Sequence, residues 1–406
     1  MPKIRKAYKV RLKTNREIES ILARYCGSAR FLWNKSLAMN LDRLNSKQGI
    51  LWYTELAFWL RLWKQSEEYG FLQQCPSQVL QQKLRDLERA IRDCFDKNQP
   101  LKRMPVFKKK GRSEGIRFPQ GFKIQGRRIF LPKIGWIGFH KSCDIEGKVK
   151  NVTITTRGGK WYASIQVEQS IEIGRHPSNS EIGIDAGIAC FAAFSDGTMV
   201  EGVNSFRKHE ETLARQQRKL SAKKKGSNNW KKLKRKISRL HMKIADVRSD
   251  FLHKLSTEVC KNQARVYVEG LNIRGMSASA RGTMEDPGSN IRAKSGLNKS
   301  ILDQGWFEFR RQLSYKLLWK GGSLVEVEYR GTSQTCSCCG NRAKENRLSQ
   351  AVFKCQVCGH EENADVNAAK NILTVGQTVM ACRANRRSGR QQEPVGNREE
   401  VLPVAS

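Results

Sequence analysis

The first hundred residues combine one alternating apolar–polar stretch with three stretches of helical spacing. Ala7–Leu12 alternates and predicts a strand, whereas 16–45, 53–64 and 77–95 carry apolar residues three and four positions apart and predict helices. The spacing predicts inward-facing residues in the first and third helices: Ile18, Ile21, Leu22, Tyr25, Ala29, Leu32, Trp33, Val79, Leu80, Leu84, Leu87, Ile91 and Phe95. The charged faces of these helices fit either solvent or a nucleic acid, and charge alone does not decide between them.

From 104 to 170 the helical spacing is replaced by short strand patterns between turn residues. The predicted strands are 116–118, 122–124, 128–131, 135–139, 148–155 and 161–166. Together with Ala7–Leu12 they predict a small barrel, with the helices inserted after its first strand. Barrels of the OB type often bind nucleic acid, although the fold alone is weak support for that.

After a predicted linker near 172–180, buried strands and helices alternate. Two short strands end in acids, Asp185 and Glu269, and a hairpin turn is predicted at 195–197. Between them, 207–260 predicts a basic helical hairpin with an apolar seam in its second arm. A mobile Gly/Ser/Arg-rich segment is expected at 273–299, followed by a helix at 302–320 with Trp306 and Phe307 among its inward residues and by a strand at 324–329.

The net charge of the chain indicates which class of partner to expect. The 406 residues include 75 Lys and Arg against 38 Asp and Glu, a net charge of +37. Such an excess predicts a polyanionic partner, and nucleic acid is the one we expect. The chain shows neither an 18-residue apolar run nor a signal pattern, so a membrane partner is not expected. Twelve cysteines without a disulfide framework suit a reducing cytoplasm.

Two Cys-x-x-Cys pairs, each followed by a glycine, predict one structural zinc site. Its ligands would be Cys336, Cys339, Cys355 and Cys358, with 16 positions (355 − 339) from the first pair to the second. A disulfide cluster or unrelated core thiols are the alternatives. Beyond the second pair, 363–373 predicts a short helix with Asp365 near its start, where an acid could simply stabilise the helix dipole.

Asp185, Glu269 and Asp365 occupy positions where an α/β sheet exposes side chains, at strand ends or at a helix start. If they meet, their like charges repel unless cations are present, and two Mg²⁺ ions would relieve that repulsion. Such a pair of ions would suit an in-line displacement at a phosphate.

These residues resemble the TnpB family, the OrfB-type proteins of IS200/IS605 transposons, which are related to Cas12 effectors. The resemblance rests on I-G-I-D-A-G-I at 182–188, Y-V-E-G-L-N at 267–272, the first cysteine pair and N-A-D-V-N-A-A-K-N-I-L at 363–373. Supporting stretches lie at 27–35, 80–87 and 131–137. It implies an α+β multidomain fold: a wedge β-barrel with an inserted helical recognition domain, then an RNase H-like RuvC domain with an inserted zinc ribbon. The implied boundaries are 1–15 for the first barrel strand, 16–103 for the helical domain, 104–170 for the rest of the barrel, 171–180 for a linker, 181–332 for RuvC, 333–362 for the ribbon, 363–375 for the last RuvC helix and 376–406 for a flexible basic tail.

The resemblance also implies an RNA-guided DNA endonuclease that binds a transposon-end-derived guide RNA and cleaves double-stranded target DNA beside a short adjacent motif. Asp185, Glu269 and Asp365 fill the catalytic, magnesium-binding positions, and Tyr53, Ser77 and Gln81 fall near the positions for motif contacts. From the charge pattern we expect backbone contacts at Lys223, Lys224, Lys225, Lys231, Lys232, Lys234 and Arg235. The chain is expected to act in the bacterial cytoplasm, associated with the nucleoid when bound to DNA, and to be genetically linked to a transposase without contacting it.

Three other functions remain as alternatives. A guide-directed DNA-binding repressor with an inactive nuclease would bind without cutting, although all three acids are present. A single-strand transposase would need a His-hydrophobe-His motif with a nucleophilic tyrosine, which we do not find. A guide-free junction resolvase would leave the helical and barrel regions without a role.

Overall fold

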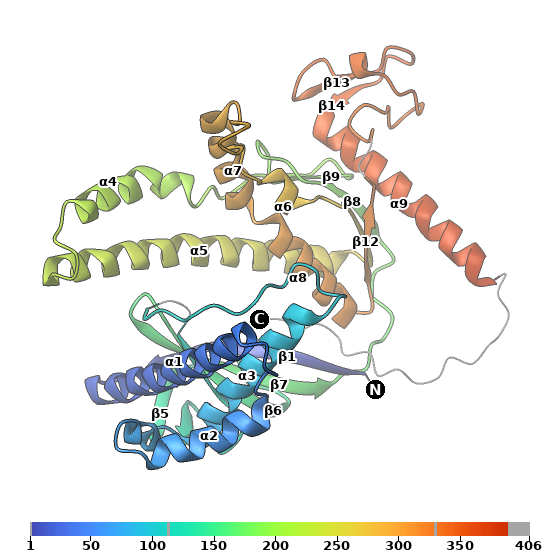
Figure 1. Cartoon of the computed structure of the whole chain (residues 1–406). Coiled ribbons are helices and arrows are strands. Elements are labelled where there is room, and N and C mark those ends of the chain that lie inside the picture. The colour runs from blue at the N-terminus through green and yellow to red at the C-terminus, as the bar shows by residue number, and fades with distance from the viewer. Residues whose placement is uncertain (1, 112–113, 329–330, 389–406) are drawn as a thin grey trace. The chain divides into compact units, whose positions relative to one another are not determined.

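The computed structural model describes residues 2–111, 114–328 and 331–388. The chain divides into two compact units, Lys3–Ser170 and a unit that begins at Ile171. Each unit is considered by itself below (Figure 1).

The first unit is built on one antiparallel sheet of seven strands in the order β2-β6-β7-β1-β5-β4-β3. The strands are β1 (Lys3–Lys13), β2 (Gly115–Phe118), β3 (Lys123–Gln125), β4 (Arg128–Leu131), β5 (Gly135–His140), β6 (Lys148–Arg157) and β7 (Lys160–Ser170). The first strand lies between β7 and β5, so the helices between β1 and β2 are an insertion, as predicted. In the described residues β2 and β3 remain unpaired edges, which corrects the expected closed barrel to a curled, open sheet.

The inserted helices are α1 (Arg16–Asn45), α2 (Tyr53–Gln65) and α3 (Ser77–Phe95), with the short 3₁₀ turn η1 (Gly70–Gln74). The Asn15 side chain caps α1 by accepting a hydrogen bond from the Ile18 N–H at 2.8 Å. Most of the predicted apolar seam residues are buried, with Leu22, Leu32 and Leu80 fully inaccessible. Burial of these residues confirms the helical periodicity from which α1 and α3 were predicted. Phe95 is the exception: at the last residue of α3 it is 59% exposed, which corrects its predicted inward position.

The second unit contains a mixed five-stranded sheet in the order β10-β9-β8-β11-β12. Its strands are β8 (Glu181–Asp185), β9 (Ala192–Phe194), β10 (Met199–Val200), β11 (Arg265–Glu269) and β12 (Ser323–Val327). β8, β11 and β12 are parallel neighbours, whereas β9 runs antiparallel to β8. The carboxyl ends of β8 and β11 therefore meet at the same edge of the sheet.

Helices cover both faces of this sheet. α5 (Asn228–Asn262) and α8 (Trp306–Trp319) pack through Leu252 and Leu313 against one face, and α9 (Ala364–Ser388) packs through Ile372 against the other. α9 lies very close to β8, because a Cβ built on Gly183 would be 2.2 Å from the Ala369 carbonyl oxygen. Glycine at 183 is therefore required by the close approach of α9.

The basic stretch after the sheet hairpin forms a helical hairpin, as predicted. It consists of η2 (Arg207–His209), α4 (Glu210–Ser221) and α5, and its two arms lie side by side in Figure 1. In the expected seam of α5, Ile237 and Ile244 are buried, but Val247 is 39% exposed.

Three local expectations are corrected by the structure. The segment expected to be mobile contains α6 (Ile273–Met276) and α7 (Ile291–Gln304), and Gly305 separates α7 from α8. Phe307 is 60% exposed rather than inward. α9 continues to Ser388 instead of ending near 375, and the rest of the predicted tail, 389–406, lies outside the described residues.

The cysteine-rich segment between β12 and α9 is small. It contains η3 (Lys344–Asn346) and the two-stranded sheet of β13 (Val352–Lys354) and β14 (Glu361–Asn363). Among the described residues, every helix is too short or too polar to cross a bilayer.

Candidate active site and metal centre

The structure brings the three predicted acids to one edge of the mixed sheet. Asp185 and Glu269 are the last residues of the parallel strands β8 and β11, whose preceding residues Ile184 and Val268 are register partners. Asp365 is the second residue of α9, and one of its carboxylate oxygens lies 3.8 Å from a Cβ built on Gly187, just beyond β8. Strand ends and a helix start thus supply one carboxyl group each.

The acids share an environment that disfavours negative charge. Burial is the main cause of the raised pKa of Asp185, which reaches about 7, and the charges of Glu269 and Asp365 add to it. Burial also raises the pKa of Glu269 and that of Asp365. The Thr332 hydroxyl opposes this at Glu269, because it donates a hydrogen bond to the Glu269 Oε1 at 3.1 Å.

Arg347 supplies positive charge at the acidic site, and the sequence analysis missed it. Its Nη2 lies 3.5 Å from the Asp365 Oδ1, and its charge opposes the rise in the pKa of both Asp365 and Asp185. The guanidinium also donates to the backbone carbonyls of Ser349 and Gln350, which fixes the side chain from the cysteine-rich segment. Arg347 follows η3 in a stretch without periodicity, so no pattern in the sequence marks it.

The donor set fits divalent cations that prefer oxygen ligands. Three partly buried carboxylates with one nearby guanidinium leave excess negative charge in a site where burial already makes it costly. Within the described part of the chain, only the cysteine cluster gathers three or more ligand atoms within 4.8 Å of one another. The three carboxylates are not gathered that tightly.

The four predicted cysteines form a compact ligand cluster that suits one structural zinc ion. Their sulfur atoms all lie within 4.8 Å of one another, and the Cys336–Cys358 and Cys339–Cys355 sulfurs are 3.6 Å apart. Sulfurs placed tetrahedrally at about 2.3 Å from zinc would be about 3.8 Å apart. All twelve cysteines are free, which argues against the disulfide alternative, and Cys338 is exposed and outside the cluster.

Each cysteine pair is held by the same tight turn. Gly340 and Gly359 adopt φ of +76° and +71°, and each donates its N–H to the carbonyl of the first cysteine of its pair. Glycine adopts this left-handed conformation at little cost, which explains why one follows each pair.

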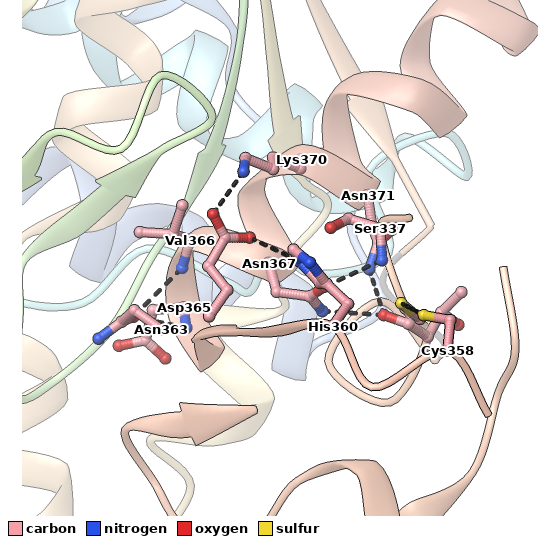
Figure 2. Close-up of polar contacts among 12 residues, drawn as sticks. Ser337, Cys358, His360, Asn363, Asp365, Val366, Asn367, Lys370 and Asn371 are labelled. Atoms are coloured by element: carbon pink, nitrogen blue, oxygen red, sulfur yellow. Dashed lines mark hydrogen bonds and ion pairs between the residues drawn. The ribbon is translucent and has the colours of Figure 1, made fainter. Parts of the chain in front are cut away.

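Helix α9 carries Asp365 and also two asparagines that bind the chain entering the cysteine cluster (Figure 2). The Asn367 side chain accepts from the Ser337 N–H at 2.9 Å and donates to the Thr335 carbonyl at 2.8 Å. One turn later, Asn371 donates to the carbonyls of Thr332 and Thr335 at 2.8 and 2.7 Å. Asp365 therefore lies on the same helix that is hydrogen-bonded to the chain entering the cluster.

The three candidate DNA-contacting residues lie near one another in the first unit. Ser77 and Gln81 are both exposed and one turn apart on α3. Arg85, a further turn along, places its guanidinium 4.7 Å from the Tyr53 ring centroid. Lys64 donates to the Ser77 hydroxyl at 2.8 Å. Arg85 and Lys64 are thus additional members of this surface that the sequence analysis did not name.

The seven candidate backbone-contacting residues occupy the tip of the helical hairpin. All are exposed, and none forms an ion pair with another described residue. The seven are Lys223, Lys224, Lys225, Lys231, Lys232, Lys234 and Arg235. The tip therefore presents uncompensated positive charge to solvent.

Comparisons with known proteins agree with this architecture. Residues 164–280 match a family profile described as "Probable transposase" for OrfB of IS605, 306–372 match the Cas12f1-like TNB domain, and 1–49 match a helix-turn-helix domain of OrfB. The chain is 50% identical over 392 residues to the "Putative RNA-guided DNA endonuclease InsQ" of Escherichia coli K12, covering 96% of this chain and 97% of that protein.

Two further relatives are more distant. A "Putative RNA-guided DNA endonuclease" of Streptomyces pristinaespiralis is 31% identical over 97% of both chains. The "CRISPR-associated endodeoxyribonuclease Cas12f1" of Sulfoacidibacillus thermotolerans is 30% identical over 53% of this chain and 50% of that protein. Since the identity over nearly the full length and the three matched profiles agree, the chain belongs to the TnpB family, the OrfB-type proteins of IS605 transposons, related to Cas12f.

Proposed function

We propose that this protein is an RNA-guided DNA endonuclease that hydrolyses target DNA at Asp185, Glu269 and Asp365. The observation that carries the proposal is the gathering of these three desolvated carboxyl groups at one sheet edge. The names of the full-length relatives support the same activity.

The site's own residues define what each part would do. Asp185, Glu269 and Asp365 would hold two Mg²⁺ ions, which when bound activate water and stabilise a leaving 3′ oxygen. The Thr332 hydroxyl orients the Glu269 carboxylate. Arg347 neutralises part of the charge at Asp365 and is placed to meet a phosphate oxygen entering the site.

The remaining domain assignments are part of the same proposal. The open sheet of the first unit with its inserted helices corresponds to a wedge domain and recognition domain, and the mixed sheet corresponds to a RuvC domain interrupted by the zinc ribbon. A guide RNA would meet the basic hairpin tip, and an adjacent DNA motif would meet the surface around Tyr53, Ser77 and Gln81. Bacterial cytoplasm, with nucleoid DNA as target, is the setting that a relative from E. coli suggests.

The test is purification from cells that carry the flanking transposon end. We expect co-purifying RNA and Mg²⁺-dependent cleavage of a plasmid that carries the matching target beside the adjacent motif. Absence of bound RNA would contradict guidance by RNA. Target binding without cleavage would instead support the repressor alternative with an inactive nuclease.

A further inference from the structure

An exposed aromatic ring lies beside the acidic site. Phe307 is the second residue of α8 and is exposed, whereas its neighbours Trp306 and Phe309 are buried. Single exposed apolar side chains are common on protein surfaces and carry no meaning alone. The position of Phe307 distinguishes it from the others, because this residue lines the same hollow as Glu269.

The hollow at Glu269 is apolar and shallow. Leu271, Ile273 and Phe309 are among the apolar residues that line it together with Phe307. Its free volume of about 30 Å³ holds about two water molecules. A ligand as large as a nucleobase would therefore lie over the hollow, against the exposed ring, rather than inside it.

The start of α8 is fixed to the loop between β8 and β9. The Trp306 indole donates to the Phe191 carbonyl at 3.3 Å, and the Gly187 N–H donates to the same carbonyl at 3.3 Å. The Phe309 ring meets the Phe191 ring edge-on, with their centroids 5.2 Å apart. The backbone that carries Phe307 is thus held beside the acids before any substrate binds, which lowers the entropic cost of a contact with its ring.

The surroundings of the ring favour a nucleobase over a phosphate. Arg310 also lines the hollow, but its Nη1 is paired with the Glu326 carboxylate at 3.0 Å. The Phe307 ring offers an aromatic face, on which nucleobases of any identity stack. A phosphate held at Glu269 brings its own base close to this ring, because base and phosphate belong to one nucleotide. In a duplex both faces of a base are covered by its neighbours, so only an unpaired base could stack there.

We propose that Phe307 is a stacking platform for an unpaired nucleobase next to the scissile phosphate of the DNA strand that is cleaved. The stacked base fixes its nucleotide, so that the phosphate stays at Glu269 and the neighbouring acids. The inference rests on the proposed function and adds a substrate contact to the same site. Because every base has an aromatic face, the contact depends on the presence of a base and not on its identity.

The test is a cycle of cleavage rates that combines Phe307→Ala with targets that lack one base. Guide-loaded protein cuts a matching target that is left unpaired around the mapped cut, and an abasic nucleotide replaces each position beside the cut in turn. At saturating target we expect Phe307→Ala to cut the intact target about 5- to 100-fold more slowly, and one abasic position to slow wild type by a similar factor. Phe307→Ala should lose nothing further on that abasic target, because ring and base form one contact. Target affinity should stay near that of wild type, since pairing with the guide supplies it.

Matched variants separate stacking from packing. Phe307→Trp keeps an aromatic face and should cut as fast as wild type, whereas Phe307→Leu keeps only apolar bulk and should be slowed like Phe307→Ala. Phe95→Ala removes a ring of similar exposure at the end of α3 and should change neither the rate nor the effect of the abasic position. The melting temperature of Phe307→Ala should equal that of wild type. A lower melting temperature, together with equal slowing on intact and abasic targets, would show that the ring is a packing residue and would overturn the proposal.

A second measurement does not depend on cleavage. 2-Aminopurine replaces the base at the sensitive position in a target bound to guide-loaded Glu269→Gln protein. Stacking on the Phe307 ring should quench its fluorescence, and combining Glu269→Gln with Phe307→Ala should restore it. Equal fluorescence with and without the ring would contradict stacking.

The two proposals fail in different ways. If guide-loaded wild type cuts the intact target but the losses from Phe307→Ala and from the abasic position multiply, only the stacking platform is wrong. If guide-loaded wild type cuts no target, the proposed function fails and the platform fails with it.

Discussion

Single residues at the acidic edge carry charges whose effect depends on their neighbours. Asp185 and Glu269 are separated by 84 positions (269 − 185), and only the parallel pairing of β8 with β11 makes them neighbours. Once they are neighbours, removing charge from one acid changes the site without changing its shape.

Glu269→Gln tests the catalytic assignment. The amide keeps the shape of the side chain and can still accept from the Thr332 hydroxyl, but it lacks the charge that a metal ligand needs. We expect cleavage in Mg²⁺ to fall by at least about 100-fold while target binding is retained. Glu326→Gln on the neighbouring strand β12 is the control, because its half-exposed carboxylate pairs with Arg310 instead. Full cleavage by Glu269→Gln would refute the assignment.

Arg347 is the residue through which the cysteine-rich segment acts on the acids. Arg347→Ala removes the cation 3.5 Å from Asp365 and should lower cleavage by about 10- to 100-fold, with Arg347→Lys restoring part of the loss because charge is kept. Cleavage rates and zinc content are measured together. A loss of zinc in Arg347→Ala would mean that the effect is structural, and Arg310→Ala should leave the rate near that of wild type.

At the scale of elements, the fit of helix α9 on β8 depends on the absence of one side chain. Gly183→Ala places a Cβ 2.2 Å from the Ala369 carbonyl oxygen, so α9 and Asp365 with it must shift. We expect the free energy of unfolding to fall by about 1–3 kcal/mol. Gly296→Ala within α7 has open space around it and should instead raise stability by about 0.5–1 kcal/mol. Denaturant unfolding of both variants checks the pair, and equal stabilities would contradict the close approach.

The contact between α5 and α8 predicts a pH dependence of stability. The Lys316 ammonium donates to the His253 carbonyl and to the hydroxyls of Ser256 and Thr257, and burial lowers its pKa to about 8 from 10.5. Between these values the unfolded chain binds more protons than the folded one, so this lysine makes stability rise as pH increases from about 8 to 10.5. Wild type should therefore gain stability relative to Lys316→Met across that window. A difference that stays constant with pH would show that the lysine is not desolvated.

Elements with an apolar seam could be predicted from the sequence, and those held by polar contacts could not. α1 and α3 begin and end where their seams predict, since burial of Leu32 or Leu84 fixes the period. α7 has little such seam, because Leu297 and Leu302 are exposed. Its last turn is instead held by the buried Asp303, whose carboxylate accepts from the Phe206 N–H at 2.9 Å. A contact across so many positions leaves no local pattern.

The same limit applies to the sites. The three acids were predictable because strand ends and a helix start are visible as local patterns, and the cysteines because their spacing is specific. Arg347 follows no pattern of its own, and its partner Asp365 becomes a neighbour only in the folded chain. The open edges of the first sheet likewise depend on pairing between distant strands, which alternation alone does not determine.

At the scale of the whole molecule, we expect that loss of zinc from the cysteine cluster also lowers DNA cleavage at the three acids. The chain passes from β12 through the cysteines into α9, the helix that carries Asp365. From the same helix, Asn367 and Asn371 hydrogen-bond to the segment that leads into the cysteines. Removing the metal would free the cysteine turns, and the first of these contains Ser337, whose N–H donates to Asn367 on α9. Arg347 lies between the two cysteine pairs, where its guanidinium donates to the Ser349 and Gln350 carbonyls. Asp185 and Glu269 would stay in place on β8 and β11, but Asp365 and Arg347 would lose the contacts that position them.

Cys355→Ser is the variant that tests this coupling. We expect bound zinc to fall from one ion per chain to none and cleavage to fall by at least about 10-fold, while guide RNA remains bound because the basic hairpin tip belongs to other elements. Cys338→Ser changes an exposed thiol outside the cluster and should retain zinc and cleavage. Zinc release, RNA content and plasmid cleavage are measured on the same samples. Full cleavage by zinc-free protein would show that Asp365 is held without the cluster, and loss of RNA together with zinc would show that the ribbon supports the whole second unit rather than the active site.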